Sequence, residues 1–366
     1  MRTARGWPVP ASASLGATCL LVLAACGDPP DRALWHEPGT PASASAPAIA
    51  APTATPGPPP ELTLAFAGDV HFTDRTRDLL ADPETALGPF APMLRAADFA
   101  MLNLETAVTD RGTPEPKTYH FRAPPTAYQA LQAAGVDLVS LANNHALDYG
   151  QVGLADTLAA ARDAGMAYVG AGRDATAAYA PHLTTVAGVR LAVLGFSQVH
   201  ELAESWQATG SRAGIAMAFD TDRVTGAVAR ARAAADLVIV YLHWGREGDS
   251  CPTGEMRDAA ELLAGAGADI VLGTHAHVLL ADGWLDGTYV HWGLGNFVWW
   301  GDSHSTDTGV LLLTVRDGRM ADVDFRPGMV SGTGQPVPVD GADRDRLRQR
   351  LDAAADCAGL APAPGR

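Results

Sequence analysis

The stretch ADIVLGTHAHV, residues 268–278, ends an apolar run in two histidines one residue apart, His275 and His277. Alternate residues of an extended strand point to opposite sides, so two such imidazoles converge only if the backbone turns. Gly273 stands just before the pair. The stretch therefore predicts a buried strand that leads into a turn where ligands are held.

Four other apolar runs end in the same kind of side chain. They are LTLAFAGDVH, DFAMLNLE, VDLVSLANNH and ADLVIVYLHWG, and their ends carry Asp69, His71, Glu105, Asn144, His145 and His243. Helical patterns such as GQVGLADTLAAARDAG and TDRVTGAVARARAAAD lie between several of them. This order predicts a largely parallel sheet covered by helices, with its functional crevice beyond the carboxyl ends of the strands. We therefore expect these side chains to converge on one site.

The chemistry of these residues indicates a metal centre. Imidazole, carboxylate and amide oxygen suit Mn, Zn, Fe or Co better than Ca or Mg, and no cysteine is among them. One tetrahedral ion would need fewer ligands than the seven candidates, which are Asp69, His71, Glu105, Asn144, His243, His275 and His277. We therefore predict two divalent transition-metal ions that share a carboxylate. Two ions roughly 3.5–4 Å apart can clamp the attacking and leaving oxygens of a phosphoryl displacement.

Over residues 62–300 the ordered blocks AGDVH, NLE, LANNH, HWG, GTHAHV and GNF resemble the CapA-type capsule-synthesis family, also called poly-γ-glutamate biosynthesis proteins. That family is similar in turn to the calcineurin-like metallophosphoesterases. The resemblance implies a four-layer α/β/β/α sandwich over residues 61–330, with a site at one edge of its two sheets. It also implies ligand roles: Asp69, His71 and His277 at one ion, Asn144, His243 and His275 at the other, Glu105 as the bridge and His145 as the general acid.

Two blocks depart from the phosphoesterase pattern. Where those enzymes carry Gly-Asp, this chain has Asn103-Leu104-Glu105, so its bridging carboxylate is one methylene longer. Where they carry Gly-Asn-His, it has Asn143-Asn144-His145.

Further residues are candidates for substrate contacts. Lys117 and Arg122 in KTYHFRAPP either belong to a solvated loop or receive an anionic group, for which arginine offers bidentate capture. Asn296 follows Gly295 and is expected to support a ligand or contact substrate. The neighbouring Trp299 and Trp300 are either core residues or line the cleft.

The N-terminus resembles a targeting segment. In residues 1–25, arginines precede LGATCLLVLAAC, which resembles a bacterial lipoprotein signal with Cys26 as the lipidated residue. A plainly cleaved signal or an uncleaved anchor are the alternatives, and all three imply export. Residues 26–60 are rich in Pro, Ala, Ser and Thr and are predicted to be a tether. We expect a lipid-anchored protein on the extracytoplasmic face of the cell membrane.

Two cysteines remain after that segment, Cys251 and Cys357. In an exported protein they either form a disulfide or stay as two free thiols, and a metal role for Cys251 is a third reading. Residues 309–327, GVLLLTVRDGRMADVDFRP, are expected to form a hairpin turning at Asp317-Gly318, and residues 331–366 a C-terminal tail.

The charge balance limits the partners. With 26 basic and 41 acidic residues, a formal charge of -15, the chain offers no electrostatic footprint for nucleic acid. We expect a hydrolytic protein acting on an anionic envelope polymer or another phosphoester substrate, in polymer synthesis, export or trimming. Two alternatives remain: a non-catalytic factor that holds a polymer or a membrane synthase partner, and a metal-dependent amide hydrolase.

Overall fold

The structure, a computed structural model, describes residues 61–300 and 304–362, all within one compact unit of the chain, Pro56–Arg366. The predicted signal segment, Cys26 and the tether lie outside the described residues. Among the residues described, no helix combines the length and apolar character that a membrane span requires.

An eight-stranded sheet carries the first of the predicted strand ends. Its order is β18-β17-β16-β1-β2-β5-β6, and β15 pairs with the end of β1. The strands β1, β2, β5 and β6 run parallel, whereas β16, β17 and β18 form an antiparallel edge. The bounds are β1 Glu61–Val70, β2 Phe99–Leu104, β5 Leu138–Ser140, β6 Ala167–Val169, β15 Asn296–Val298, β16 Asp307–Arg316, β17 Arg319–Val330 and β18 Pro336–Pro338.

A six-stranded sheet in the order β13-β14-β12-β11-β9-β8 carries the remaining strand ends. Its centre, β9, β11, β12 and β14, is parallel, and β8 and β13 pair antiparallel at its edges. The bounds are β8 His182–Val186, β9 Val189–Ser197, β11 Leu237–His243, β12 Ile270–Thr274, β13 Asp282–Leu285 and β14 Thr288–His291. Two short ladders complete the described strands: β3 Ala107–Val108 with β4 Arg122–Ala123, and β7 Ala171–Gly172 with β10 Gly214–Ile215.

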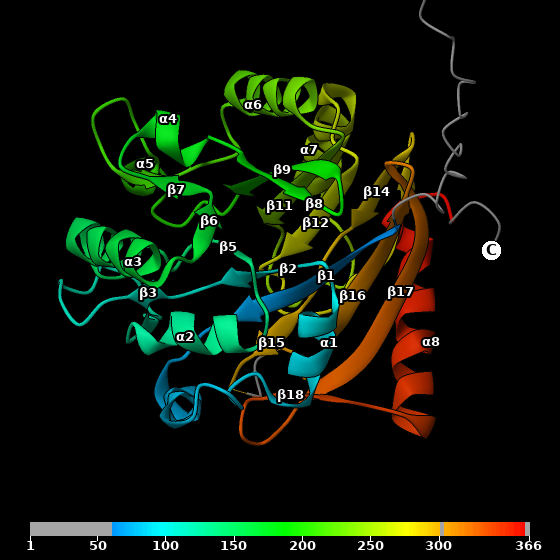
Figure 1. Cartoon of the computed structure of the whole chain (residues 1–366), viewed down its shortest axis with the longest axis horizontal. Helices are drawn as coiled ribbons and strands as arrows, with labels where there is room; N and C mark the ends of the chain where they lie inside the picture. Colours follow the sequence, from blue (N-terminus) through cyan, green and yellow to red (C-terminus); the bar gives the residue numbers. More distant parts are fainter. Residues whose placement is uncertain (1–60, 301–303, 363–366) are drawn as a thin grey trace, which may run out of the picture. The chain divides into compact units, whose positions relative to one another are not determined.

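Side-chain alternation along the strands separates four layers. In β11, Ile239 and Tyr241 pack in the core between the two sheets, whereas Val238 and Val240 pack in the core beneath α6 and α7. β1 divides its side chains in the same way, between the inter-sheet core and the core beneath α1, α2 and α3. The predicted α/β/β/α sandwich is therefore confirmed (Figure 1).

Eight α-helices lie among the described residues, and α7 and α3 show clear sequence signals at an end. The bounds are α1 Ala91–Ala96, α2 Thr126–Ala133, α3 Gly150–Ala164, α4 Ala175–Ala178, α5 Ala203–Trp206, α6 Thr221–Ala234, α7 Gly254–Ala266 and α8 Gly341–Ala358, with 3-10 turns at Asp74–Ala81 and Gly88–Phe90. At the start of α7, the Thr253 hydroxyl accepts a hydrogen bond from the Met256 amide at 3.2 Å. α3 ends at Gly165, whose φ of 72° is the left-handed conformation that glycine adopts most easily.

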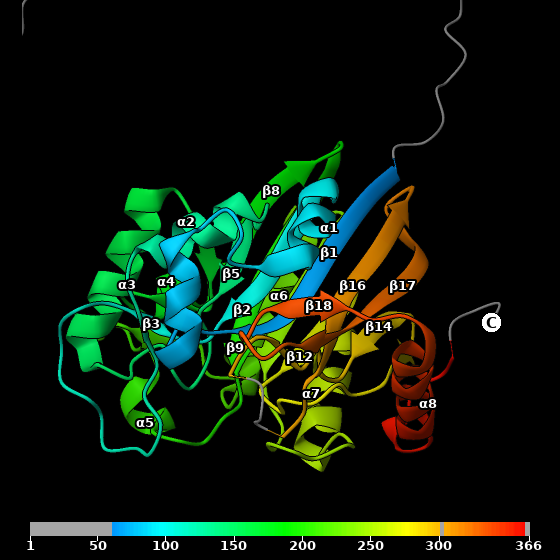
Figure 2. The same cartoon turned by 90° about the horizontal axis from the view of Figure 1, so that it is seen from below.

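The C-terminal segment corrects one prediction. Residues 331–366 were expected to be a tail, but β18 joins the first sheet and α8 contacts β13 and β17 (Figure 2). The sequence of α8 is rich in charge and buries few side chains, among them Leu347, so it gives little helical periodicity. Its attachment is partly ionic: Arg346 and Arg350 both bind the buried carboxylate of Asp307 in β16. The prediction failed because these tertiary contacts leave no local pattern.

Two other predicted features of this half of the chain are present. β16 and β17 form the expected hairpin, and Asp317 and Gly318 turn with φ values of 52° and 70°. Two successive positive φ values match the right-handed twist of the paired strands. Cys251 and Cys357 form a disulfide with a Cα–Cα distance of 5.8 Å, which links the loop before α7 to the end of α8.

Candidate metal centre

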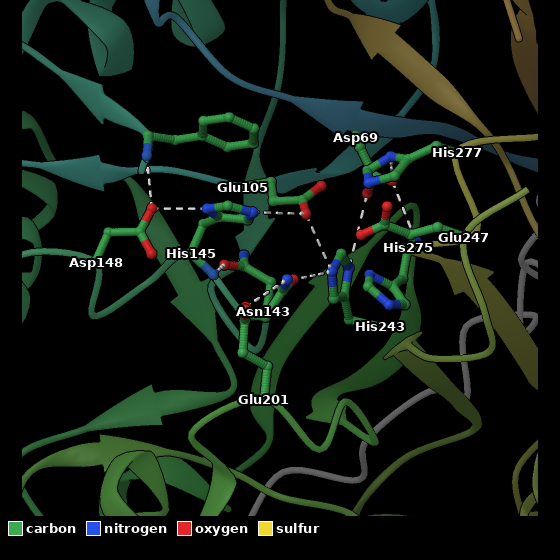
Figure 3. A network of polar contacts seen from close by, with 12 residues as sticks. Asp69, Glu105, Asn143, His145, Asp148, Glu201, His243, Glu247, His275 and His277 are labelled. Atoms are coloured by element: carbon green, nitrogen blue, oxygen red, sulfur yellow. Dashed lines mark hydrogen bonds and ion pairs between the residues drawn. The ribbon is translucent and has the colours of Figure 1, made fainter. Parts of the chain in front are cut away.

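The ends of β1, β2, β11 and β12 meet at one buried cluster of polar side chains. Each strand end delivers its residue within or just beyond the strand, and the loop after β5 adds two more. Every one of these side chains is buried: Asp69, His71, Glu105, Asn144, His145, His243, His275 and His277. Figure 3 shows the carboxylates and imidazoles converging from both sheets. The structure therefore brings the predicted residues together.

The backbone turns at the histidine pair, as the stretch at residues 268–278 predicts. His275 and His277 have φ values of 84° and 55°, in the left-handed region that non-glycine residues rarely occupy. Only glycine fits at position 273, because the Trp292 backbone lies so close that a Cβ would be 2.1 Å from its carbonyl oxygen. The turn is held from the other sheet, since the His275 amide donates to Asp69 Oδ2 at 3.1 Å. Strain of this kind persists only where surrounding contacts impose it.

Asp69 and Glu105 have opposite electrostatic environments. Burial would raise the pKa of Asp69, but hydrogen bonding to His277 and the nearby imidazoles hold it below its ordinary value. Burial raises the pKa of Glu105 well above its usual range, and the Asp69 charge adds to the shift. Glu105 Oε1 lies 3.2 Å from His243 Nε2, yet neither carboxylate oxygen accepts a hydrogen bond from a described residue. A cation between the two carboxylates would reverse the penalty on Glu105.

The unsatisfied atoms of the cluster are suited to a divalent metal. His71 Nε2, His275 Nδ1 and both Glu105 oxygens are buried without hydrogen-bond partners among the described residues. Leaving each such atom unpaired costs about 1–3 kcal/mol, which coordination to a cation would remove. Two groups of ligand atoms fall within 4.8 Å of one another, namely Glu105, His275 and His277, and Asp69, Glu105 and His243. Glu105 is the residue that the two groups share.

Three of the proposed histidine ligands are in the neutral form that metals bind. Burial lowers the pKa of His71 and His275 well below the ordinary value, and that of His243 to about 3. A neutral imidazole offers a lone pair, so these groups need not lose a proton to coordinate an ion. His277 differs: burial lowers its pKa, but the Glu105 and Asp69 carboxylates raise it to about 9.

Neighbouring amides orient the ligands. Asn296 Oδ1 lies 2.8 Å from His277 Nδ1, which leaves Nε2 of that ring as the atom available for a metal. Asn144 Oδ1 lies within hydrogen-bond distance of His243 Nε2, at 2.8 Å, so the amide oxygen faces the cluster. Asn103, which sequence reasoning did not single out as a site residue, donates from Nδ2 to Asp69 Oδ1 at 2.7 Å. The NLE block could have indicated Asn103 as a site residue, because Asn103 and Glu105 are two residues apart and point to the same face of a strand.

His145 stands beside the cluster with a carboxylate behind it. Its Nδ1 lies 2.6 Å from Asp148 Oδ2, and its Nε2 faces Glu105 Oε1 at 3.9 Å. Phe121 stacks on the imidazole with ring centroids 3.8 Å apart. Burial raises the pKa of Asp148 to about 6. Asp148 was not predicted as a site residue, although it follows His145 by only three residues.

The two basic residues proposed as anion contacts have different surroundings. The Lys117 side chain is only 2% exposed, and its ammonium binds Asp148 at 3.0 Å and Glu201 at 2.8 Å. The Arg122 guanidinium stacks on the Tyr149 ring at 3.4 Å. Because two carboxylates already neutralise Lys117, its predicted role as an anion contact is corrected. Arg122 keeps a polar contact with the Arg111 carbonyl and is not paired with an acid among the described residues.

The tryptophans after the last histidine pair are largely core. Trp299 is buried and packs with Phe121 and Val330, and Trp300 lies against that cluster. The Trp299 ring also contacts His71 at 4.3 Å and His277 at 4.4 Å between centroids. The aromatic group is therefore a buried cluster that packs against His71 and His277, two of the proposed ligands of one ion.

The fold is a four-layer sandwich with a buried set of histidines, carboxylates and amides at its strand ends. The family described as bacterial capsule synthesis protein PGA_cap matches residues 63–299. The chain belongs to this CapA-type family of capsule and poly-glutamate biosynthesis proteins.

Individual relatives agree with that membership. The capsule biosynthesis protein CapA of Bacillus anthracis is 30% identical over 303 residues, 80% of this chain and 73% of that protein. The PGA biosynthesis protein CapA of Bacillus subtilis is 32% identical over 296 residues, 79% of this chain and 76% of that protein. Among solved structures, a phosphatase of Mycoplasma pneumoniae has a TM-score of 0.48 and 12% identity, covering 80% of this chain and 97% of that one.

Proposed function

We propose that this chain is an exported, lipid-anchored hydrolase that uses a dinuclear metal site in the synthesis, export or trimming of an anionic envelope polymer. The named functions of its relatives, capsule and PGA biosynthesis, support the polymer. The carboxylates and imidazoles of the cluster support the metal. The lipoprotein-like segment ending at Cys26 supports the location.

One observation carries the hydrolytic part of the proposal. His145 has Asp148 at Nδ1 and faces Glu105, the carboxylate shared by both ligand groups, with its other nitrogen. A purely structural metal site would not need His145, a buried imidazole outside the ligand groups, to face it with Asp148 at its other nitrogen. The pair has the arrangement by which a carboxylate orients a histidine for proton transfer.

In the proposed reaction the metal cluster and the His145–Asp148 pair have separate roles. When bound, two divalent ions would lower the pKa of a water and stabilise charge on the phosphoryl oxygens. His145 would give a proton from Nε2 to the leaving oxygen. Burial, then the Lys117 charge, hold its pKa well below the ordinary value, so the resting ring is neutral. An anionic substrate within hydrogen-bond reach favours its protonated form, as does Asp148.

The test is hydrolysis by the metal-loaded full chain. Apo protein would be reconstituted separately with Mn, Zn and Fe, and then assayed on an unactivated phosphodiester and on a γ-glutamyl peptide. We expect two ions per chain and cleavage of the phosphodiester. Cleavage of the peptide alone would establish an amide hydrolase instead. Two bound ions with neither activity would favour a polymer-holding or synthase-assembly role.

A further inference from the structure

The buried ammonium of Lys117 joins three separate loops beside the metal centre. It lies 3.0 Å from Asp148 and 2.8 Å from Glu201, and it donates to the backbone carbonyl of Asn144. The ring of Trp206 lies 5.1 Å from Nζ on another side. Lys117 is the only lysine in the chain. A buried ammonium is costly unless it stays paired. Moving Asp148, Glu201 or the Asn144 carbonyl away from Lys117 is therefore unfavourable, and the three groups are held in place.

Asn144 has two chemically different ends, and only one can bind a metal. Its oxygen Oδ1 is a ligand atom, whereas the Nδ2 amide protons would repel a cation. In the structure Oδ1 points to His243 Nε2 at 2.8 Å, and Nδ2 lies 3.5 Å from Glu201 Oε2. Glu201 is thus the acceptor that keeps the amide nitrogen turned away from the cluster. Figure 3 shows Glu201 reaching toward the cluster near Asn143 and His243.

We propose that Glu201 and Lys117 are positioning residues that hold Asn144 with its amide oxygen towards the second ion. Glu201 sets which atom of the amide faces inward, and Lys117 fixes both Glu201 and the Asn144 backbone. The same ammonium binds Asp148, the partner of His145, so the ligand and the proposed acid are positioned as one unit. This inference rests on the metal site of the proposed function.

The experiment measures metal binding rather than turnover. Apo full chain would be titrated with Zn and with Mn by calorimetry, for the wild type, Glu201→Ala, Glu201→Gln and Glu204→Ala. Glu201 is 40% exposed, so its removal leaves the core intact, and thermal unfolding of each variant would check this. Glu204 is an exposed acid on the same segment and serves as the matched control.

We expect Glu201→Ala to weaken one of the two ions by roughly 10–100-fold, the usual effect of losing an outer partner of a ligand. The other ion should be unaffected. Glu201→Gln should fall between Glu201→Ala and wild type, because its carbonyl still accepts from Asn144 Nδ2 while the ion pair with Lys117 is lost. Glu204→Ala should bind both ions as the wild type does.

The outcomes distinguish this inference from the proposed function. If wild type binds two ions and Glu201→Ala binds both with unchanged affinity, the positioning role is wrong and the proposed function stands. If Glu201→Gln is as weak as Glu201→Ala, amide orientation is not what Glu201 controls, and that part is overturned. If the wild type binds fewer than two ions, the inference and the dinuclear site both fail.

Discussion

The backbone amide of His275 donates a hydrogen bond to Asp69 Oδ2 at 3.1 Å, across 206 residues of sequence. This contact joins the end of β1 in one sheet to the turn after β12 in the other. The aspartate accepts at the same time from Asn103, so its position is fixed from both sheets. The candidate metal centre therefore depends on how the two sheets pack together.

Replacing Asp69 should remove metal from the protein. Asp69→Ala deletes both a proposed ligand and the acceptor for the His275 amide. The loss of metal affinity should exceed the roughly 10–100-fold seen for outer-sphere partners. Metal content after dialysis measures it, and His275→Ala should behave in the same way. Asp110→Ala, an exposed acid, is the control. Full metal content in Asp69→Ala would contradict its assignment as a ligand.

Replacing His145 should slow hydrolysis without removing metal. His145→Ala deletes the proposed acid, and the rate on an unactivated phosphodiester should fall by about 10²–10⁴-fold. The loss should be much smaller for a nitrophenyl ester, whose leaving group needs little protonation. Rates on both esters and metal content are the measurements. His200→Ala, an exposed histidine, should match wild type. An equal loss on both esters would exclude the acid role.

The attachment of α8 should depend on pH. Burial would raise the pKa of Asp307, but Arg346 and Arg350 hold it below its ordinary value of 3.8. A carboxyl group whose pKa is lower in the folded state stabilises the fold at pH values above its unfolded-state pKa. That contribution is lost as the pH falls through the folded-state pKa. Asp307→Asn should cost about 1–3 kcal/mol of unfolding free energy at neutral pH.

The difference in melting temperature between wild type and Asp307→Asn should therefore shrink as pH is lowered below about 4. Asp345→Asn, which removes an exposed acid of α8, is the control and should change stability little at any pH. A difference that stays constant down to the lowest usable pH would show that the Asp307 charge contributes nothing.

The disulfide should stabilise the domain. Cys251 and Cys357 are 106 residues apart, and losing a bridge across so long a segment typically costs about 2–5 kcal/mol. Denaturant unfolding of Cys357→Ser should show this loss, and reduced wild type should match it. The double variant Cys251→Ala with Cys357→Ala should not respond to reductant. Thiol labelling of both cysteines after unfolding of untreated protein would show that no bridge forms.

The proposed membrane location rests on Cys26, which lies outside the described residues. Cys26→Ser should release the protein from the membrane fraction or leave its precursor uncleaved, because the lipid attachment point is lost. Fractionation and intact mass are the measurements. Normal processing with membrane retention would count against the lipoprotein assignment and leave the cleaved signal or uncleaved anchor as alternatives.

Local pattern was enough to predict much of the fold. Apolar runs ending in Asp69, Glu105, His243 and the His275 turn marked four strands, because side-chain alternation and a polar strand end are visible in sequence. The helices α3 and α6 lie where their periodicity placed them. The β16–β17 hairpin also had a local turn signal, but its pairing with β1, the addition of β18 and the docking of α8 needed contacts with distant segments that no local signal encodes.

The sequence by itself determined which residue types reach the site, since each stands at the end of a strand that hydrophobic burial forces inward. Only the tertiary structure decided their partners. It placed Lys117 between Asp148 and Glu201 rather than at the surface, and it set Asp148 behind His145. Lys117, Asp148 and Glu201 come from separate loops, and a buried charge is satisfied by whichever groups chain packing brings within hydrogen-bond distance.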